Sequence, residues 1–191
     1  MLAGRAAAIP IRVSRVTDPE LVSVADLDRA TVAEATAALR PCCASTRWVS
    51  QLVAGRPYGT LDALTKASNA AIAALTWPDI EEALAAHPRI GDRPAGAGRE
   101  AAWSRQEQAA TSQAGPGAQA ALRSANADYE TRFGHVFLIC ATGLRASDTL
   151  IALHERMTND PATEHEAVRA ELGQIAALRL AKAFGSPGDP R

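Results

Sequence analysis

The chain has 191 residues and a mass of 20.0 kDa, which fits one domain and leaves little room for a second. Its net charge of -1 and its 4% of aromatic residues argue against nucleic acid as a partner, and no apolar run is long enough for a membrane helix. We therefore expect neither nucleic acid nor a membrane as a partner. Alanine supplies 43 residues, and its high helix propensity favours a helical chain.

The first half of the chain is predicted to hold a series of helices behind a disordered tail over residues 1–20. Apolar residues recur at helical spacing from about Leu21 to Leu39, and Pro41 ends that helix. Further helices are expected over 42–52, 61–75 and 77–86, the last of them capped by Thr76. Because Pro88 disfavours helical geometry at the residue before it, this helix ends ahead of a glycine-rich loop over 91–98.

The second half is predicted to continue as helices over 99–111 and 118–133, with Gly134 stopping or kinking the second. The apolar run over 135–142 could be a strand, but we predict a helix because no partner strand is visible elsewhere. Ser147 is expected to cap the next helix, and a capping box from Thr163 to Glu166 the last one. The fold class is therefore all-α, a compact single-domain bundle of about eight helices over 21–184, followed by a disordered tail over 185–191.

The number and spacing of the cysteines indicate the redox state of the compartment in which the chain works. Cys42, Cys43 and Cys140 are odd in number, and two of them are adjacent, which predicts no disulfide framework and a reducing compartment. They lack the spacing of a zinc site, so we expect no bound metal. The chain is predicted to be cytoplasmic.

One segment whose side chains could take part in catalysis is His87-Pro88-Arg89-Ile90-Gly91-Asp92. A histidine at the end of a helix, fixed by the proline that follows, is held in direction yet accessible and titrates near neutral pH. It could act as a general acid and base. The alternative is a histidine that only caps the helix and is stabilised by the helix dipole.

Two further segments also carry candidate residues. Ser104, Glu107 and Gln108 are spaced i, i+3 and i+4, so they share one helix face and could bind a polar ligand; the alternative is a solvated polar face. Arg132 stands before the apolar run and could bind a carboxylate through both guanidinium nitrogens; the alternative is a salt-bridged arginine beside a buried core helix.

Taken together, these segments resemble the family of 2-oxo-4-hydroxy-4-carboxy-5-ureidoimidazoline (OHCU) decarboxylases of urate degradation. The resemblance spans about Leu27 to Leu180. The matching motifs are His87-Pro88-Arg89-Ile90-Gly91, Ser104-x-x-Glu107-Gln108 and Asn126-x-x-Tyr129-x-x-Arg132-Phe133-Gly134-x-x-Phe137-x-Ile139-Cys140-Ala141. Weaker echoes include Arg156-Met157-x-Asn159 and Leu178-Arg179-Leu180.

The resemblance implies an enzyme that removes CO2 from OHCU and yields (S)-allantoin. It needs no cofactor, because the C=N bond of the substrate accepts the electrons. His87 would be the general acid and base, and Glu107 would orient it or bind the ureido N–H groups. Arg132 would hold the anionic end of the substrate. The remaining substrate-binding residues would be Pro88, Ser104, Arg105, Gln106, Gln108 and the backbone of Phe137, Leu138, Ile139, Cys140 and Ala141. The resemblance also suggests a homodimer.

Three other readings stay open from the residues alone. A non-catalytic helical module that binds a small molecule would keep the pocket without needing His87. A structural or interaction protein would use its alanine-rich helices for assembly. A metal-dependent hydrolase would use His87 and Glu107, although a catalytic metal usually has about three protein ligands.

Overall fold

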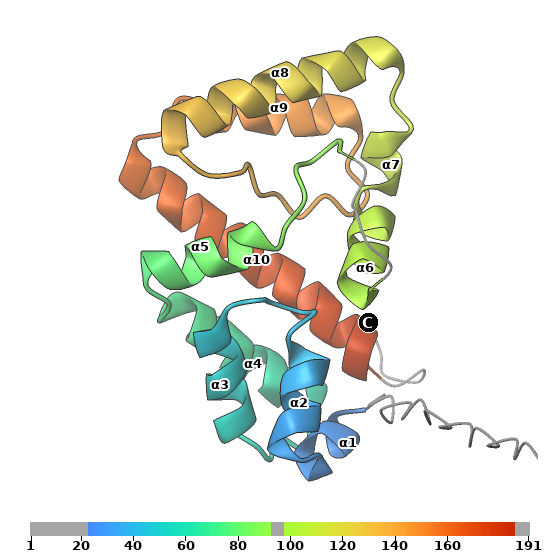
Figure 1. The fold of residues 1–191 in the computed structure, drawn as a ribbon, viewed down its shortest axis with the longest axis vertical. Coiled ribbons are helices and arrows are strands. Elements are labelled where there is room, and N and C mark those ends of the chain that lie inside the picture. The colour runs from blue at the N-terminus through green and yellow to red at the C-terminus, as the bar shows by residue number, and fades with distance from the viewer. Residues whose placement is uncertain (1–22, 93–97, 186–191) are drawn as a thin grey trace, which may run out of the picture.

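The computed structural model describes residues 23–92 and 98–185, which form ten helices and no strand (Figure 1). This confirms the all-α prediction, with ten helices in the described residues where about eight were expected. The tails predicted over 1–20 and beyond Gly185 lie outside the described residues. The helices are α1 (Val24–Arg29), α2 (Val32–Leu39), α3 (Thr46–Ala54), α4 (Leu61–Ala73), α5 (Trp77–Ala85), α6 (Arg99–Glu107), α7 (Ala109–Ser112), α8 (Pro116–Phe133), α9 (Ala146–Arg156) and α10 (Pro161–Phe184).

Two of the predicted helices are each divided in the structure. The helix expected to reach Leu39 is α1 and α2, because Ala30 is extended and Thr31 starts a new helix with a capping box. Thr31 N donates to Glu34 Oε2 over 2.9 Å, and Glu34 N donates to Thr31 Oγ1 over 3.3 Å. The helix expected over 99–111 is divided at Gln108, whose φ and ψ of -93° and 7° leave the helical region.

The prediction of a helix over 135–142 was wrong. Gly134 ends α8 in the left-handed conformation, with φ of 78°, and the chain then runs extended without a partner strand in the described part of the molecule. Side chains satisfy part of its backbone instead. Arg156 Nη1 donates to Leu138 O over 2.6 Å, and Cys140 N donates to Glu171 Oε2 over 2.7 Å.

The starts of four helices also differ from the prediction, and one of them is α8, which begins at Pro116 rather than at Ala118. α3 begins after Ser45 rather than at Cys42, and α9 begins after Arg145 rather than Ser147. α10 begins at Pro161 rather than at the capping box expected from Thr163. Asp160 is its cap and accepts from Ala162 N and Thr163 N over 2.9 and 3.1 Å. A proline in the first helical position has its φ already set for the helix, and this favours the earlier start.

The packing places two apolar clusters on either side of one long helix. α10 runs diagonally through the molecule and packs on α4, while α8 packs on α9 at the other end (Figure 1). The larger cluster joins α1 to α5 with α10, and the smaller lies beneath α8 and α9. The extended segment over 136–141 contributes to both. Within the described ranges, no helix is long and apolar enough to span a membrane.

Candidate active site

A small, partly open cavity lies between the end of α5, helix α6, the extended segment and α10. Its volume is about 30 Å3, which corresponds to roughly two water molecules. A substrate the size of a substituted imidazoline ring therefore needs its walls to move apart on entry. The lining residues are His87, Pro88, Ile90, Ser104, Glu107, Gln108, Phe137, Leu138, Ile139, Cys140, Ala141, Thr142, Ile175 and Arg179.

His87 lines this cavity and has an unpaired ring nitrogen. Its Nδ1 lies 2.9 Å from Ala83 O. A carbonyl oxygen only accepts, so Nδ1 carries the proton and Nε2 keeps a free lone pair. Nε2 is buried and has no hydrogen-bond partner among the described residues. Burial, helped by the nearby charge of Arg179, lowers the pKa of His87 to about 4. The imidazole is therefore a neutral base at pH 7.

This environment differs from the accessible histidine expected from the sequence. The side chain is only 9% exposed, because α6 and α10 cover the end of α5. The same burial moves its pKa away from neutrality, since it disfavours the charged form.

Glu107 and Arg179 form a buried ion pair in the wall beside His87. Arg179 Nη2 donates to Glu107 Oε2 over 2.8 Å, and its Nε donates to Oε1 over 3.2 Å. Burial alone would raise the pKa of the Glu107 carboxyl, but Arg179 and Lys182 hold it below its usual value. Glu107 is thus ionised. Arg179 also donates to Ser104 Oγ over 3.1 Å, which leaves the Ser104 hydroxyl proton available to a ligand.

Two side-chain amides hold the loop that carries His87. Gly91 N donates to Gln108 Oε1 over 3.0 Å, and Asn126 Nδ2 donates to Ile90 O over 2.9 Å. Gly91 has a φ of +87°, a conformation that a side chain would strain. The amides of two different helices therefore fix the position of this loop relative to the cavity.

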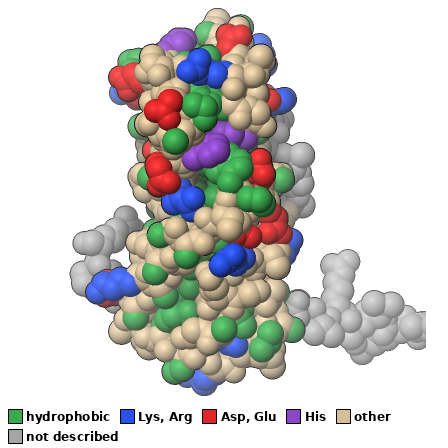
Figure 2. Space-filling model, turned by 90° about the vertical axis from the view of Figure 1, so that its left-hand side faces the viewer, with side chains coloured by type: hydrophobic (Ala, Val, Ile, Leu, Met, Phe, Trp, Pro, Cys, Tyr) green, Lys and Arg blue, Asp and Glu red, His purple; other side chains and the backbone are tan. Residues whose placement is uncertain are grey.

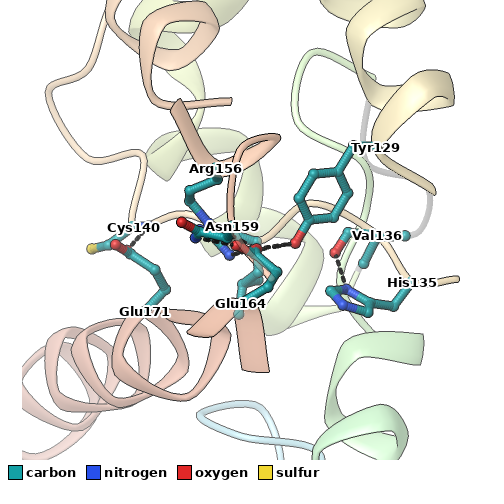
Figure 3. A network of polar contacts seen from close by, with 9 residues as sticks. Tyr129, His135, Val136, Cys140, Arg156, Asn159, Glu164 and Glu171 are labelled. Carbon is teal, nitrogen blue, oxygen red and sulfur yellow. Dashed lines mark hydrogen bonds and ion pairs between the residues drawn. The ribbon is translucent and has the colours of Figure 1, made fainter. Parts of the chain in front are cut away.

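A second buried network holds the extended segment in place (Figure 3). Arg156 Nε donates to Glu164 Oε1 over 2.8 Å, and the Tyr129 hydroxyl donates to the same oxygen. Asn159 Nδ2 donates to Glu164 Oε2 over 2.8 Å. Because Arg156 also donates to Leu138 O, the same network fixes the position of this wall of the cavity.

The structure brings together most of the predicted site residues but not all of them. Arg105 and Gln106 are exposed and do not line the cavity. Arg132 is exposed as well: its Nη2 donates to Asn159 O over 2.9 Å, and its guanidinium lies 5.1 Å from the centre of the Phe133 ring. Arg105 and Gln106 lie on another face of α6, and Arg132 belongs to α8, none of whose residues lines the cavity.

Arg179 is the cavity residue that sequence reasoning missed as a site residue. It lies in the apolar run Leu178-Arg179-Leu180, four residues after Ile175, which also lines the cavity. A single arginine on the apolar face of a long helix is the signal that could have found it, because an unpaired buried charge is too costly to occur.

Of the remaining titratable groups, Cys140 lines the cavity, whereas His135, His165, Cys42 and Cys43 lie outside it. His165 stacks on Trp77 with ring centres 3.5 Å apart, and His135 meets the same indole edge-on at 5.1 Å. Figure 2 shows histidine side chains at the surface on one face of the molecule. In the described ranges, no three His, Cys, Asp or Glu side chains gather in a way that could hold a metal ion. The three cysteines are free, and burial raises the pKa of Cys42 to about 12 and of Cys43 to about 11.

The comparisons with known proteins point to one family. Residues 28–181 match the family model of OHCU decarboxylase. The chain is 36% identical over 135 residues to 2-oxo-4-hydroxy-4-carboxy-5-ureidoimidazoline decarboxylase of Bos taurus, an alignment that covers 68% of this chain and 78% of that protein. It is 32% identical over 145 residues to the enzyme of the same name in Amia calva, with 73% and 78% covered.

A longer relative and two solved structures extend this result. The chain is 32% identical over 148 residues to the uric acid degradation bifunctional protein TTL of Arabidopsis thaliana; the alignment covers 75% of this chain but only 45% of that protein. A crystal structure of OHCU decarboxylase in the presence of (S)-allantoin superposes with a TM-score of 0.67 at 29% identity, covering 77% of this chain and 96% of that one. A structure of (S)-allantoin synthase, at 19% identity and a TM-score of 0.64 with 85% and 54% covered, shares the fold.

We predict that His87 stays neutral down to about pH 4, with the proton on Nδ1. Its folded-state pKa lies below the usual value near 6.5, so the unfolded state binds more protons between these two values. Folding stability from this group is therefore full above about pH 6.5 and declines as the pH falls toward 4. Nitrogen-15 NMR of the imidazoles, assigned with a His87→Asn variant, measures both properties. Protonation near pH 6.5, or a proton on Nε2, would contradict the geometry.

We also predict that Arg179→Met lowers the free energy of unfolding by about 3–5 kcal/mol, because it strands a buried carboxylate. Urea denaturation measures this. Arg123→Met, at an exposed position of α8, is the matched control and should change stability by less than about 0.5 kcal/mol. Adding Glu107→Leu to Arg179→Met should restore much of the loss, because no charge is then left unpaired. Equal effects of Arg179→Met and Arg123→Met would show that the pair is not buried in solution.

Proposed function

The chain belongs to the OHCU decarboxylase family of urate degradation, and we propose that this decarboxylase converts OHCU into (S)-allantoin and CO2 with His87 as its general acid and base. The observation that carries the proposal is the free lone pair of His87 Nε2 at a cavity lined by the motifs of the family. An acid–base group contributes roughly 100- to 10,000-fold to a reaction when it lies within hydrogen-bond reach of the proton it moves.

The chemistry of the substrate defines what His87 must do. One ring carbon carries a hydroxyl and the carboxylate, and its neighbour carries the ureido group and a C=N bond. When CO2 leaves, its bonding electrons form a double bond between these two carbons, and the electrons of the C=N bond move to the ring nitrogen, which takes up a proton. Nε2 of His87 then takes the hydroxyl proton and returns it to the neighbouring carbon. A site that holds the substrate in one orientation delivers this proton to one face, which yields one enantiomer.

We assign the binding of the substrate to the polar groups around the cavity. We assign the anionic end of the substrate to Arg179 rather than to Arg132, because Arg179 lines the cavity. The Ser104 hydroxyl proton and the Gln108 amide N–H groups remain free for the ureido group and the ring of the substrate. Glu107, held ionised, would accept from the ureido N–H groups.

Only some backbone groups of the extended segment are free to bind the substrate. Leu138 O and Cys140 N are already bound by Arg156 and Glu171. Contacts to the ring would therefore come from the other backbone groups between Phe137 and Ala141.

A non-catalytic binding module is the second candidate. The same cavity and the same ion pair would serve it, because neither requires a chemical step. The two functions differ in one outcome, since a binding module returns its ligand unchanged.

The proposal extends to assembly and location. We infer a homodimer, supported by the family resemblance of the motifs, and a cytoplasmic enzyme, supported by the free thiols of the three cysteines. Sedimentation equilibrium tests the assembly, because a dimer doubles the 20.0 kDa mass of the chain; a single species at the mass of one chain would contradict it.

The test of function uses freshly generated OHCU and circular dichroism of the allantoin formed. The wild-type chain should produce (S)-allantoin faster than the unaided reaction. His87→Asn should lower kcat by roughly 100-fold or more, leaving racemic product from spontaneous decay. His154→Asn, at an exposed position of α9, is the matched control and should behave as the wild type. A folded His87→Asn protein with wild-type kcat would refute the role of His87.

The two arginine assignments are separated in the same assay. Arg179→Lys should raise KM, because an ammonium has too few donors to hold Glu107, Ser104 and Pro41 O and still bind the substrate. Arg132→Lys should leave KM unchanged if the assignment to Arg179 is right. The reverse result would return the anionic end of the substrate to Arg132.

A further inference from the structure

A second cavity adjoins the first on the other side of His87. Its volume is about 260 Å3, and Ala85, Ala86, His87, Pro88, Glu100, Ala101 and Ser104 line it. His87, Pro88 and Ser104 line both cavities. The imidazole and the serine hydroxyl therefore stand in the wall between the substrate cavity and a larger, more open space.

Glu100 is the acidic side chain that this second cavity adds. It lies one helical turn before Ser104 on α6, so the two side chains share a face of that helix. Unlike Glu107, it receives no hydrogen bond and no ion pair from the described residues, although it is partly buried.

The charges around Glu100 come from three elements. Arg179 on α10 and Arg40 at the end of α2 favour its ionised form, whereas Glu107 on its own helix opposes it. The Cys43 thiol is also within electrostatic range. Burial outweighs the two arginines and raises the pKa of the Glu100 carboxyl above its usual value. The acid form is therefore easier to populate near neutral pH than for an exposed glutamate.

The reaction needs a proton that His87 cannot supply by itself. This step rests on the proposed function. The ring nitrogen gains one proton, the ring carbon that receives the electrons gains another, and the hydroxyl loses one. Each turnover thus consumes one proton from solution as the carboxylate leaves as CO2. If His87 passes the hydroxyl proton to carbon, the proton for the ring nitrogen must come from elsewhere.

We propose that Glu100 is the entry point for this proton, which reaches the substrate through water in the second cavity and the Ser104 hydroxyl. The Glu100 carboxyl gives its proton to water, which protonates Ser104 as the serine passes its own proton to the ring nitrogen. Solvent then reprotonates Glu100. Arg179 supports the serine step, because its N–H bond to Ser104 Oγ leaves the hydroxyl proton free to point at the substrate. Glu100 is a positioning and relay residue, since it does not touch the reacting atoms.

The test is chemical rescue of a Glu100→Ala variant by a small carboxylic acid. In dilute buffer, kcat should fall by roughly tenfold, less than the 100- to 10,000-fold typical of a group at the reacting atoms. Acetate added at constant pH and ionic strength should restore kcat along a saturating curve, because acetic acid fits the space of the missing side chain. The wild-type chain and Glu155→Ala, an exposed acid on α9, should show no acetate dependence. Glu100→Asp should retain most of the activity without acetate.

Each outcome of this experiment either supports or overturns the relay through Glu100. Wild-type kcat for Glu100→Ala in dilute buffer would overturn the relay. So would a lowered kcat that acetate does not raise, because a purely structural role predicts that result. A wild-type chain that leaves OHCU unchanged would overturn the proposed function and the relay with it, whereas wild-type turnover with an unaffected Glu100→Ala variant overturns the relay alone.

Discussion

The carboxylate of Glu107 and the guanidinium of Arg179 face each other inside the protein, with only 8% and 1% of their side chains exposed. Removing two such charges from water costs several kcal/mol per ion, and close geometry with further hydrogen bonds must offset it. Here Ser104 Oγ and Pro41 O accept from the same guanidinium, and Lys182 Nζ lies 3.3 Å from Glu107. The pair thus fixes α6, α10 and the end of α2 relative to one another.

The properties of the cavity follow from this fixed arrangement. Because Arg179 lies close to His87, its charge adds to burial in keeping the imidazole neutral, while the same charge keeps Glu107 ionised. Both neighbouring groups are thereby held deprotonated at neutral pH, one as a neutral base and the other as an anion. On the opposite wall, the network around Glu164 holds the extended segment, so both sides of the site rest on buried arginine–glutamate contacts.

The sequence predicted features that depend on local chemistry. Thr76 caps α5, with its N–H donating to Asp79 over 2.8 Å, and Gly134 ends α8. Spacing correctly placed Ser104, Glu107 and Gln108 at one cavity with His87. The capping box from Thr31 to Glu34 is also visible in the sequence, but the apolar spacing across it predicts one continuous helix. The boundary before α2 is therefore not predicted.

What could not be predicted depends on contacts between distant residues. The extended path after Gly134 is held by Arg156 and Glu171, 18 and 31 residues further along the chain from the groups they bind. An apolar run of eight residues carries no sign of such partners. Arg132 and Arg179 both stand beside apolar residues in the sequence, and the structure shows that Arg179 is the one that lines the cavity.

The central claim is that the free lone pair of His87 Nε2 marks where the substrate binds. A crystal structure of this chain with (S)-allantoin tests it most directly. We expect the product in the cavity between α6, α10 and the extended segment, with a polar ring atom about 2.6–3.2 Å from Nε2 and the walls moved outward to admit it. Well-ordered allantoin bound elsewhere, with Nε2 still without a partner, would show that the substrate does not bind at His87.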